Sequence, residues 1–213
     1  ASIMVAAIAD GNEYVISGTK LFVPDAHIAN YMLVLARTDG ESEPKERITI
    51  FIVDAKSPGI GCTRLKTIAR DKLCKIDFDR VKVPEENILG QLGEGWREAE
   101  KIIDRAAVAK CCEIVGAAQQ VLEMTLDYAK TRIQFGRPIG SFQAIQHHCA
   151  NMAIDVEGAR CITYQAAWML SEGVPCAKEV AMAKAWTTTA YQRITALSHQ
   201  VHGAIAFTTD HDL

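Results

Sequence analysis

The chain has 213 residues, of which 49% are hydrophobic and 23% are charged, and this composition excludes a globally disordered protein. Its 23 Lys and Arg side chains nearly balance 26 Asp and Glu side chains, so the formal net charge is −3. Such a charge gives no attraction to nucleic acid or to an anionic membrane. No apolar run approaches the roughly 18 residues of a membrane span, and the first residues lack the pattern of a secretion signal. We therefore expect a soluble protein that is not exported.

Cysteine usage favours a reducing compartment. The chain has seven cysteines, an odd number, and no two of them form a C-x-x-C pair. Because such pairs mark structural zinc sites and redox dithiols, the sequence predicts neither a metal site nor a redox motif of that type.

The first half of the chain has the pattern of a β-sheet. Short β-branched and apolar runs occur at 14–16, 31–35 and 48–53, and turn signals rich in Asp, Asn, Gly and Pro separate them. This spacing predicts antiparallel strands in a barrel or sandwich. The glycines of segment 90–95 then stop any strand, and we place the end of this half at residue 91.

The second half is predicted to be an up-down helical bundle. Only Pro138 and Pro175 interrupt it, and they divide it into three long helical stretches, the first from about Gly95 to Lys130. Ser141 is the expected N-cap of the middle stretch. Apolar residues of this stretch recur at alternating spacings of three and four, which predicts one buried stripe: Phe142, Ile145, Cys149, Met152, Val156 and Ala159.

The segment 132–143, between the first two helical stretches, combines two arginines, two glutamines and the aromatic ring of Phe135. A guanidinium offers a planar fork of donors that suits phosphate oxygens. The Phe135 ring is suited to stack on an aromatic ring of a ligand, and the Gln143 amide is suited to hydrogen bond with the polar edge of such a ring. The alternative interpretation is a solvated turn in which residues 136–138 only reverse the chain.

A second polar cluster, from His199 to Asp212, ends the sequence. His199 and His202 are three residues apart, a spacing compatible with metal ligands, but the segment has no second pair of defined spacing. A helix that ends at Gly203 is the simpler interpretation. Asp210 is a candidate general base, because a carboxylate in a water-poor pocket has a raised pKa and can take a proton from carbon. The alternative for Asp210 is a surface aspartate.

Taken together, these two segments make the chain similar to the acyl-CoA dehydrogenases, which use FAD to oxidise the α,β bond of acyl-CoA thioesters. The resemblance spans nearly the whole chain and includes the motifs Gly18–Ala26, Phe78–Pro84 and Gln200–Gly203. It implies an α+β fold in two domains, with the middle β-domain at 1–91 and the C-terminal helical bundle at 92–213. We expect both domains to be incomplete, so that the chain is a fragment with three of the four bundle helices.

The resemblance also implies a FAD site that is shared between two subunits. Arg132, Gln134 and Phe135 would bind the pyrophosphate and adenosine part of FAD that reaches across from a neighbouring subunit. Gln143 belongs to the same site.

Further roles follow from the same resemblance. Gln200 and Gly203 correspond to the stretch that approaches the other subunit's FAD, where a missing side chain lets backbone come close to phosphate. Phe22 and Pro24 fall where family members place residues against the isoalloxazine ring. Asp104 matches a position that contacts the CoA moiety.

Asp210 occupies the position where many members of the family have a glutamate base. The base removes the α-proton while the β-hydrogen leaves as hydride to flavin N5. Asp is one methylene shorter than Glu, and a displacement of about 1 Å can cost on the order of a hundredfold in rate. Relatives that act on alicyclic carboxyl-CoA esters, and nitroalkane-oxidising relatives, use an aspartate base, which makes Asp210 a clue to the substrate.

Some positions depart from the family pattern. Family members usually have glycine at Ala204 and Ala206, and often Trp and Thr at Phe22 and Pro24. Because proline has neither an N–H nor a hydroxyl, a hydrogen bond from a Thr side chain to the flavin is absent here. An arginine that some relatives use for CoA falls at Ala107.

The resemblance implies an acyl-CoA substrate, an electron-transfer flavoprotein as acceptor and assembly as a homodimer or homotetramer. It also implies a location in the cytoplasm, or in the mitochondrial matrix of a eukaryote. Two alternatives remain open. One is a nitroalkane-oxidase-like flavoenzyme that needs no CoA, and the other is a non-catalytic truncated bundle that acts in oligomerisation.

Overall fold

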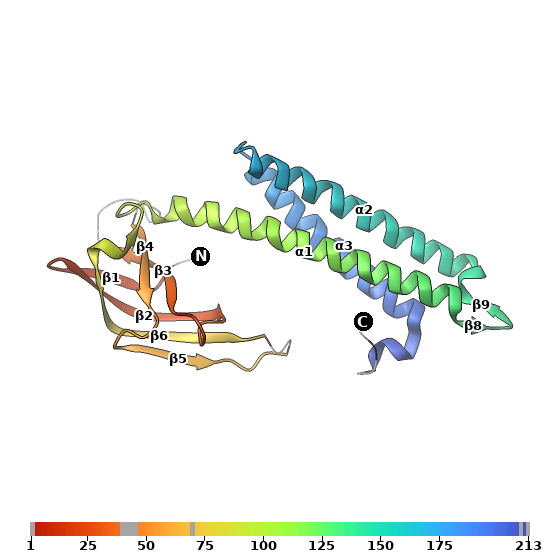
Figure 1. Cartoon of the computed structure of the whole chain (residues 1–213), viewed down its shortest axis with the longest axis horizontal. Coiled ribbons are helices and arrows are strands. Elements are labelled where there is room, and N and C mark those ends of the chain that lie inside the picture. Colours follow the sequence, from red (N-terminus) through yellow and green to blue (C-terminus); the bar gives the residue numbers. More distant parts are fainter. Residues whose placement is uncertain (1–2, 39–46, 69–70, 209–210, 212–213) are drawn as a thin grey trace. The chain divides into compact units, whose positions relative to one another are not determined.

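The computed structural model describes residues 3–38, 47–68, 71–208 and 211. It divides into two compact units, Ala1–Lys101 and Ile102–Leu213, and the division falls inside the longest helix. Figure 1 shows that strands dominate the first unit and helices the second. The predicted α+β fold in two parts is therefore confirmed.

A seven-stranded sheet with the order β5-β6-β2-β1-β3-β4-β7 forms the first unit. Neighbouring strands are antiparallel, as predicted, except that β1 and β3 run parallel. The exception arises because β2 pairs with β1 on one side and with β6 on the other, so β3 pairs with the remaining side of β1. The strands are β1 (Ala6–Asp10), β2 (Glu13–Pro24), β3 (Tyr31–Thr38), β4 (Ile48–Asp54), β5 (Ile60–Arg64), β6 (Leu73–Pro84) and β7 (Ile88–Leu89), and the 3₁₀ turn η1 (Glu85–Asn87) joins the last two.

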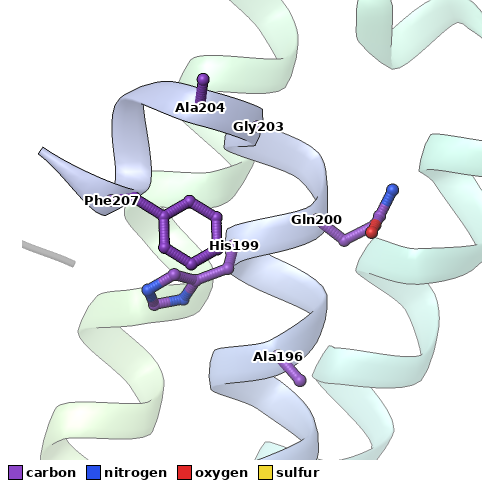
Figure 2. Close-up of a pocket in the computed structure, with 6 residues that line it drawn as sticks. All are labelled: Ala196, His199, Gln200, Gly203, Ala204 and Phe207. Carbon is purple, nitrogen blue, oxygen red and sulfur yellow. The ribbon is translucent and has the colours of Figure 1, made fainter.

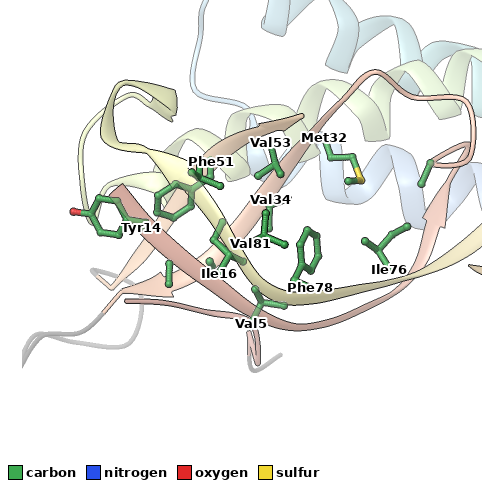
Figure 3. Close-up of a cluster of buried hydrophobic side chains, with 14 of the residues drawn as sticks. Val5, Tyr14, Ile16, Met32, Val34, Phe51, Val53, Ile76, Phe78 and Val81 are labelled. Carbon is green, nitrogen blue, oxygen red and sulfur yellow. The ribbon is translucent and has the colours of Figure 1, made fainter. Parts of the chain in front are cut away.

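The sheet curves around its own hydrophobic core. Tyr14 of β2 and Phe51 of β4 have ring centroids 5.2 Å apart, although β1 and β3 separate these strands in the sheet. Figure 3 shows apolar side chains from several strands meeting in this interior. Ile16 and Val81, which are paired across β2 and β6, are fully buried there. The curvature agrees with the predicted barrel or sandwich, because a flat sheet could not bring β2 and β4 together.

Three long helices follow: α1 (Gly95–Thr131), α2 (Gln143–Ser171) and α3 (Ala177–His202). The predicted first helix, from Gly95 to Lys130, is confirmed within one residue. Gly95 stands at its start because a Cβ there would lie 2.7 Å from the backbone nitrogen of Ile50. Between α1 and α2 lie β8 (Ile133–Gln134), β9 (Arg137–Pro138) and the 3₁₀ turn η2 (Ile139–Ser141), and η3 (Gly203–Phe207) follows α3.

The helical unit is held together by a row of apolar clusters. Met152 and Val156 of the predicted α2 stripe are buried against Ala118 and Leu122 of α1 and Ile194 of α3. This confirms the stripe at its centre, while its first members, such as Phe142, are only half-buried. The small side chains in these clusters let the helices approach closely.

Ser141 does not cap α2, and that prediction is wrong. Its Oγ donates instead to the carbonyl of Pro138 at 2.7 Å, which tightens the preceding turn. Phe142 occupies the N-cap position, and its side chain makes no capping hydrogen bond.

Candidate functional site

The β8–β9 hairpin projects an aromatic ring from the end of α1. Its two central residues both have positive φ, 54° at Phe135 and 78° at Gly136, as a type I′ turn requires. Positive φ is common for glycine but unusual for a bulky aromatic residue, and such strain clusters at binding sites. The Phe135 side chain is 92% exposed, so burial within this chain does not compensate for the backbone strain.

Arginine and aromatic side chains stack behind this turn. The guanidinium carbon of Arg137 lies 4.1 Å from the centre of the Phe142 ring, and Phe135 meets the same ring edge-on at 6.0 Å. Within the part of the chain that the structure describes, neither Arg132 nor Arg137 forms an ion pair. The hairpin therefore presents two exposed, uncompensated cations beside an exposed aromatic face, a combination suited to a phosphate joined to an aromatic ring.

The turn η2 fixes this hairpin against the end of α1. Gly140 approaches so closely that a Cβ would lie 2.9 Å from the carbonyl oxygen of Ala129. Gln146 donates from Nε2 to the Gly140 carbonyl at 3.0 Å. Gln143 is the first residue of α2 and is exposed, and Gln134 is exposed on β8. The predicted residues Arg132, Gln134, Phe135 and Gln143 are thus brought together on one connection between two helices.

A hollow of about 510 Å³ lies where α3 ends. Gly203 closes the helix with φ 69° and ψ −142°, and among the residues that the structure describes a Cβ at this position would meet no atom within 4 Å. Figure 2 shows the rings of His199 and Phe207 together beside the hollow, with Gln200 projecting from another side of α3. The lining is completed by Ala196 and Ala204. The predicted residues Gln200 and Gly203 therefore line the same hollow, and the backbone at Gly203 is accessible to a ligand there.

Buried polar contacts hold Gly203 in place. The neighbouring His202 is 5% exposed, donates from Nδ1 to the Ser198 carbonyl at 2.9 Å, and stacks on Tyr128 of α1 with ring centroids 4.4 Å apart. Burial lowers the pKa of His202, and the nearby His211 and His199 lower it further, against the opposing effect of the Ser198 hydrogen bond. The imidazole is thus held neutral at pH 7.

The Tyr128–His202 stack also relates the two groups of predicted residues. Tyr128 accepts a backbone hydrogen bond from Arg132 at 2.8 Å, one turn before the β8–β9 hairpin begins. The hairpin and the end of α3 therefore lie at the same end of the helical unit (Figure 1), and the hollow lined by Gly203 belongs to that end. Asp104 does not belong to this group, since it precedes Arg132 by 28 residues of continuous helix, or about 40 Å.

Phe22 and Pro24 lie at the end of β2, in the first unit. The register of β2 against β6 shifts between Lys20 and Val23, so Phe22 sits in a β-bulge with φ 59° and is 63% exposed. Bulges re-aim side chains next to binding sites. Pro24 is also exposed.

Lys20 lies in an apolar environment that the sequence did not indicate. It lines an apolar hollow of about 160 Å³ together with Met32, Val34, Ile76 and Phe78, and burial lowers the pKa of its ammonium group. No sequence pattern marks this lysine, because its burial depends on strands that are distant along the chain.

Asp210 lies outside the described residues. Asp104 is half-buried on α1, where its charge contributes to raising the pKa of the buried Cys176 thiol, after the larger effect of burial.

In the described ranges, no group of three or more His, Cys, Asp or Glu side chains is placed to hold a metal ion. None of the helices formed by those residues is long and apolar enough to cross a membrane.

Comparison with known proteins identifies the class to which this arrangement belongs. Residues 1–81 match the acyl-CoA dehydrogenase middle domain, and residues 93–213 match the acyl-CoA dehydrogenase C-terminal domain. The chain therefore belongs to the acyl-CoA dehydrogenase family.

Individual relatives agree with this assignment. The chain is 35% identical over 201 residues to the mitochondrial short/branched chain specific acyl-CoA dehydrogenase of Bos taurus, covering 93% of this chain and 46% of the relative. It is 33% identical to the cyclohexane-1-carbonyl-CoA dehydrogenase of Geobacter metallireducens, covering 99% and 56%. The solved butyryl-CoA dehydrogenase of Megasphaera elsdenii superimposes with a TM-score of 0.93 at 29% identity, covering 98% and 55%. The chain thus spans about half the length of these relatives.

Proposed function

We propose that this chain takes part in the FAD-dependent α,β-dehydrogenation of an acyl-CoA thioester. One observation carries the proposal. The helical unit matches the family's C-terminal domain, and one of its ends combines exposed arginines, a strained exposed phenylalanine and a glycine that opens a helix end to a ligand.

The residues at this end fit the parts of FAD. The Arg132 guanidinium is exposed and unpaired among the described residues, and it suits a pyrophosphate oxygen. Phe135 offers a free ring face for the adenine, with Gln134 and Gln143 beside it to bond polar edges. At Gly203 a Cβ would occupy open space, so backbone N–H groups can approach a phosphate there. Gln200 adds an amide next to this backbone.

Phe22 and Pro24 are proposed to lie against the isoalloxazine ring. The bulge in β2 supports this role, because it turns an exposed aromatic ring away from the sheet on a backbone that is otherwise fixed by pairing with β6. Pro24 supplies shape alone, since it has no N–H to donate.

Asp210 is proposed to take the α-proton of the acyl group. FAD supplies the hydride acceptor when it is bound. A carboxylate can remove a proton from carbon if its pKa is raised by a pocket that excludes water. A shorter base needs the α-carbon to come closer, which favours branched or alicyclic acyl groups whose bulk changes how the thioester sits. The similarity to a cyclohexane-1-carbonyl-CoA dehydrogenase supports this substrate class.

The remaining partners follow from family membership. We propose that Asp104 contacts the CoA moiety and that an electron-transfer flavoprotein accepts the electrons. Assembly as a homodimer or homotetramer is part of the same proposal, because the proposed FAD site would use residues from two subunits. The proposed location is the cytoplasm, or the mitochondrial matrix of a eukaryote.

The test is a visible absorption spectrum of the purified chain after FAD is added and the excess dialysed away. Retained bands at about 370 and 450 nm would support the proposed cofactor site. Anaerobic addition of cyclohexane-1-carbonyl-CoA, and of a nitroalkane in parallel, should then bleach the flavin with the thioester only. A colourless protein would contradict the proposal that this chain holds FAD, and bleaching by the nitroalkane alone would replace acyl-CoA as the substrate class.

A further inference from the structure

Two cysteines and a histidine gather at one edge of the β-sheet. Cys62 lies on β5, which is an edge strand of the described sheet, and Cys74 lies on the neighbouring strand β6. His27 belongs to the turn that follows β2. A backbone hydrogen bond of 3.0 Å from Asp25 to the carbonyl of Lys72 fixes this turn beside the start of β6.

The strand register places the two cysteines on the same face. Cys62 is paired with Ile76, and Cys74 is two residues before Ile76, so Cys62 and Cys74 are diagonal neighbours. Desolvation, and after it the neighbouring Cys74 side chain, raise the pKa of the Cys62 thiol, so the thiolate that attacks a peroxide forms more readily at alkaline pH.

The three groups differ in access to solvent. Cys62 is exposed, whereas Cys74 is fully buried. Cys74 Sγ lies 4.0 Å from Nδ1 of His27, within hydrogen-bond reach for sulfur, and His27 is exposed. An exposed thiol is thus backed by a buried thiol, which has its own proton acceptor.

We propose that Cys62 and Cys74 form a cross-strand disulfide when the protein meets a hydroperoxide. Cys62 sulfur attacks the peroxide, the O–O bond breaks, and Cys62 becomes a sulfenic acid while an alcohol or water leaves. Cys74 sulfur then attacks the Cys62 sulfur, and the Cys74 proton passes through His27 to the hydroxyl of the sulfenic acid, which leaves as water. Two electrons move from the two thiols to the peroxide, so the atoms and electrons balance.

The position of Cys62 on an edge strand makes closure feasible. Diagonal neighbours have Cα atoms about 7–8 Å apart, and a disulfide prefers about 4.4–6.8 Å. Bond formation therefore draws β5 toward β6 by about 1–2 Å. Since β5 is hydrogen bonded to β6 on one side only, it can move without breaking a second ladder. A bond made under such strain is reduced readily, so the modification is reversible.

The experiment is peptide mapping by mass spectrometry after treatment of the whole chain with hydrogen peroxide. Trypsin cuts after Lys56, Arg64, Lys72 and Lys75, so Cys62 leaves in peptide 57–64 and Cys74 in peptide 73–75. The expected product is these two peptides joined, two hydrogen atoms lighter than their sum, and lost on addition of dithiothreitol. Peroxide-treated protein in which Cys62 is oxidised to the sulfinic acid while Cys74 still reacts with iodoacetamide would overturn the proposal.

Variants separate the roles of the three residues. Cys62→Ser should abolish the joined peptide, and Cys161→Ser, which removes another exposed thiol on α2, should leave its yield unchanged. His27→Asn should slow the second step by about tenfold or more, because Cys74 loses its proton acceptor. Dimedone, which traps sulfenic acids, should then label Cys62 more heavily than in the parent chain. Equal labelling of the two proteins would remove His27 from the reaction.

Discussion

Gly203→Ala tests whether the end of α3 is shaped for a ligand. The residue has φ 69° and ψ −142°, a combination that only glycine adopts without strain. An added methyl group would meet no atom of the described residues within 4 Å, so the penalty comes from the backbone and not from a clash. Strain of this kind costs about 1–3 kcal/mol. At about 2–4 °C for each kcal/mol in a chain of this size, the melting temperature should fall by several degrees.

Gly173→Ala is the matched control. Gly173 follows α2 with φ 68°, and a Cβ there would also meet no atom within 4 Å, but it lies in the turn between α2 and α3 and lines no part of the hollow. Thermal unfolding followed by circular dichroism gives the stability of each variant. Retention of FAD after dialysis gives the effect on binding. Both variants should melt earlier, and only Gly203→Ala should lose flavin.

The melting temperature and the FAD retention together separate a local effect at Gly203 from general destabilisation. If Gly203→Ala is destabilised but retains FAD as well as the parent chain, no backbone approach occurs at the hollow. If Gly173→Ala loses flavin to the same degree, the loss reflects general destabilisation and not the space beside Gly203.

Four further perturbations test other parts of the structure. Arg132→Ala should weaken FAD binding by about 2 kcal/mol, or roughly thirtyfold in a fluorescence titration, while Lys130→Ala, which removes the same charge two residues away, should not. Because burial lowers the pKa of His202 below its ordinary 6.5, the unfolded chain binds this proton at a higher pH than the folded chain. The free energy of unfolding in urea should therefore fall as the pH drops below 6.5, and His202→Gln should reduce this fall. Gly95→Ala forces a Cβ into the β4 backbone, with contacts of 2.7–2.9 Å, and should destabilise the first unit by about 1–3 kcal/mol in chemical denaturation. Asp210→Asn should leave FAD bound but stop exchange of the substrate α-proton with deuterated solvent, and continued exchange would remove this residue from the mechanism.

Proline positions and one apolar period predicted the three long helices, and short apolar runs predicted parts of strands β2, β3 and β4. The apolar stripe of α2 has a period that only a helix can place on one face, and Met152 and Val156 are buried where that period puts them. Gly95 was a good marker of a helix start for a reason that the sequence does not display, namely its contact with the backbone of β4. The error at Ser141 has a local cause, because its hydroxyl found a nearer acceptor in the Pro138 carbonyl.

Features that depend on tertiary contacts could not be predicted in this way. The positive φ of Phe135 cannot be read from residue type, since most bulky residues avoid that region. The half-buried state of Lys20 depends on side chains from β3 and β6, and the proximity of Cys62 to Cys74 depends on the register of β5 against β6. Motif spacing detects chemistry that is local in the chain, and these groups are adjacent only after the sheet forms.

Buried polar contacts order the end of the helical unit that carries the candidate site. Thr125 of α1 and Ser198 of α3 are fully buried, and their hydroxyls lie 2.8 Å apart. Ser198 also accepts from His202, which stacks on Tyr128. An apolar contact tolerates sliding, whereas buried hydroxyl and imidazole groups are satisfied in one arrangement only, because an unpaired polar group there is costly. These contacts therefore fix the axial position of α3 against α1, and with it the backbone at Gly203, as the approach of backbone N–H groups to a phosphate requires.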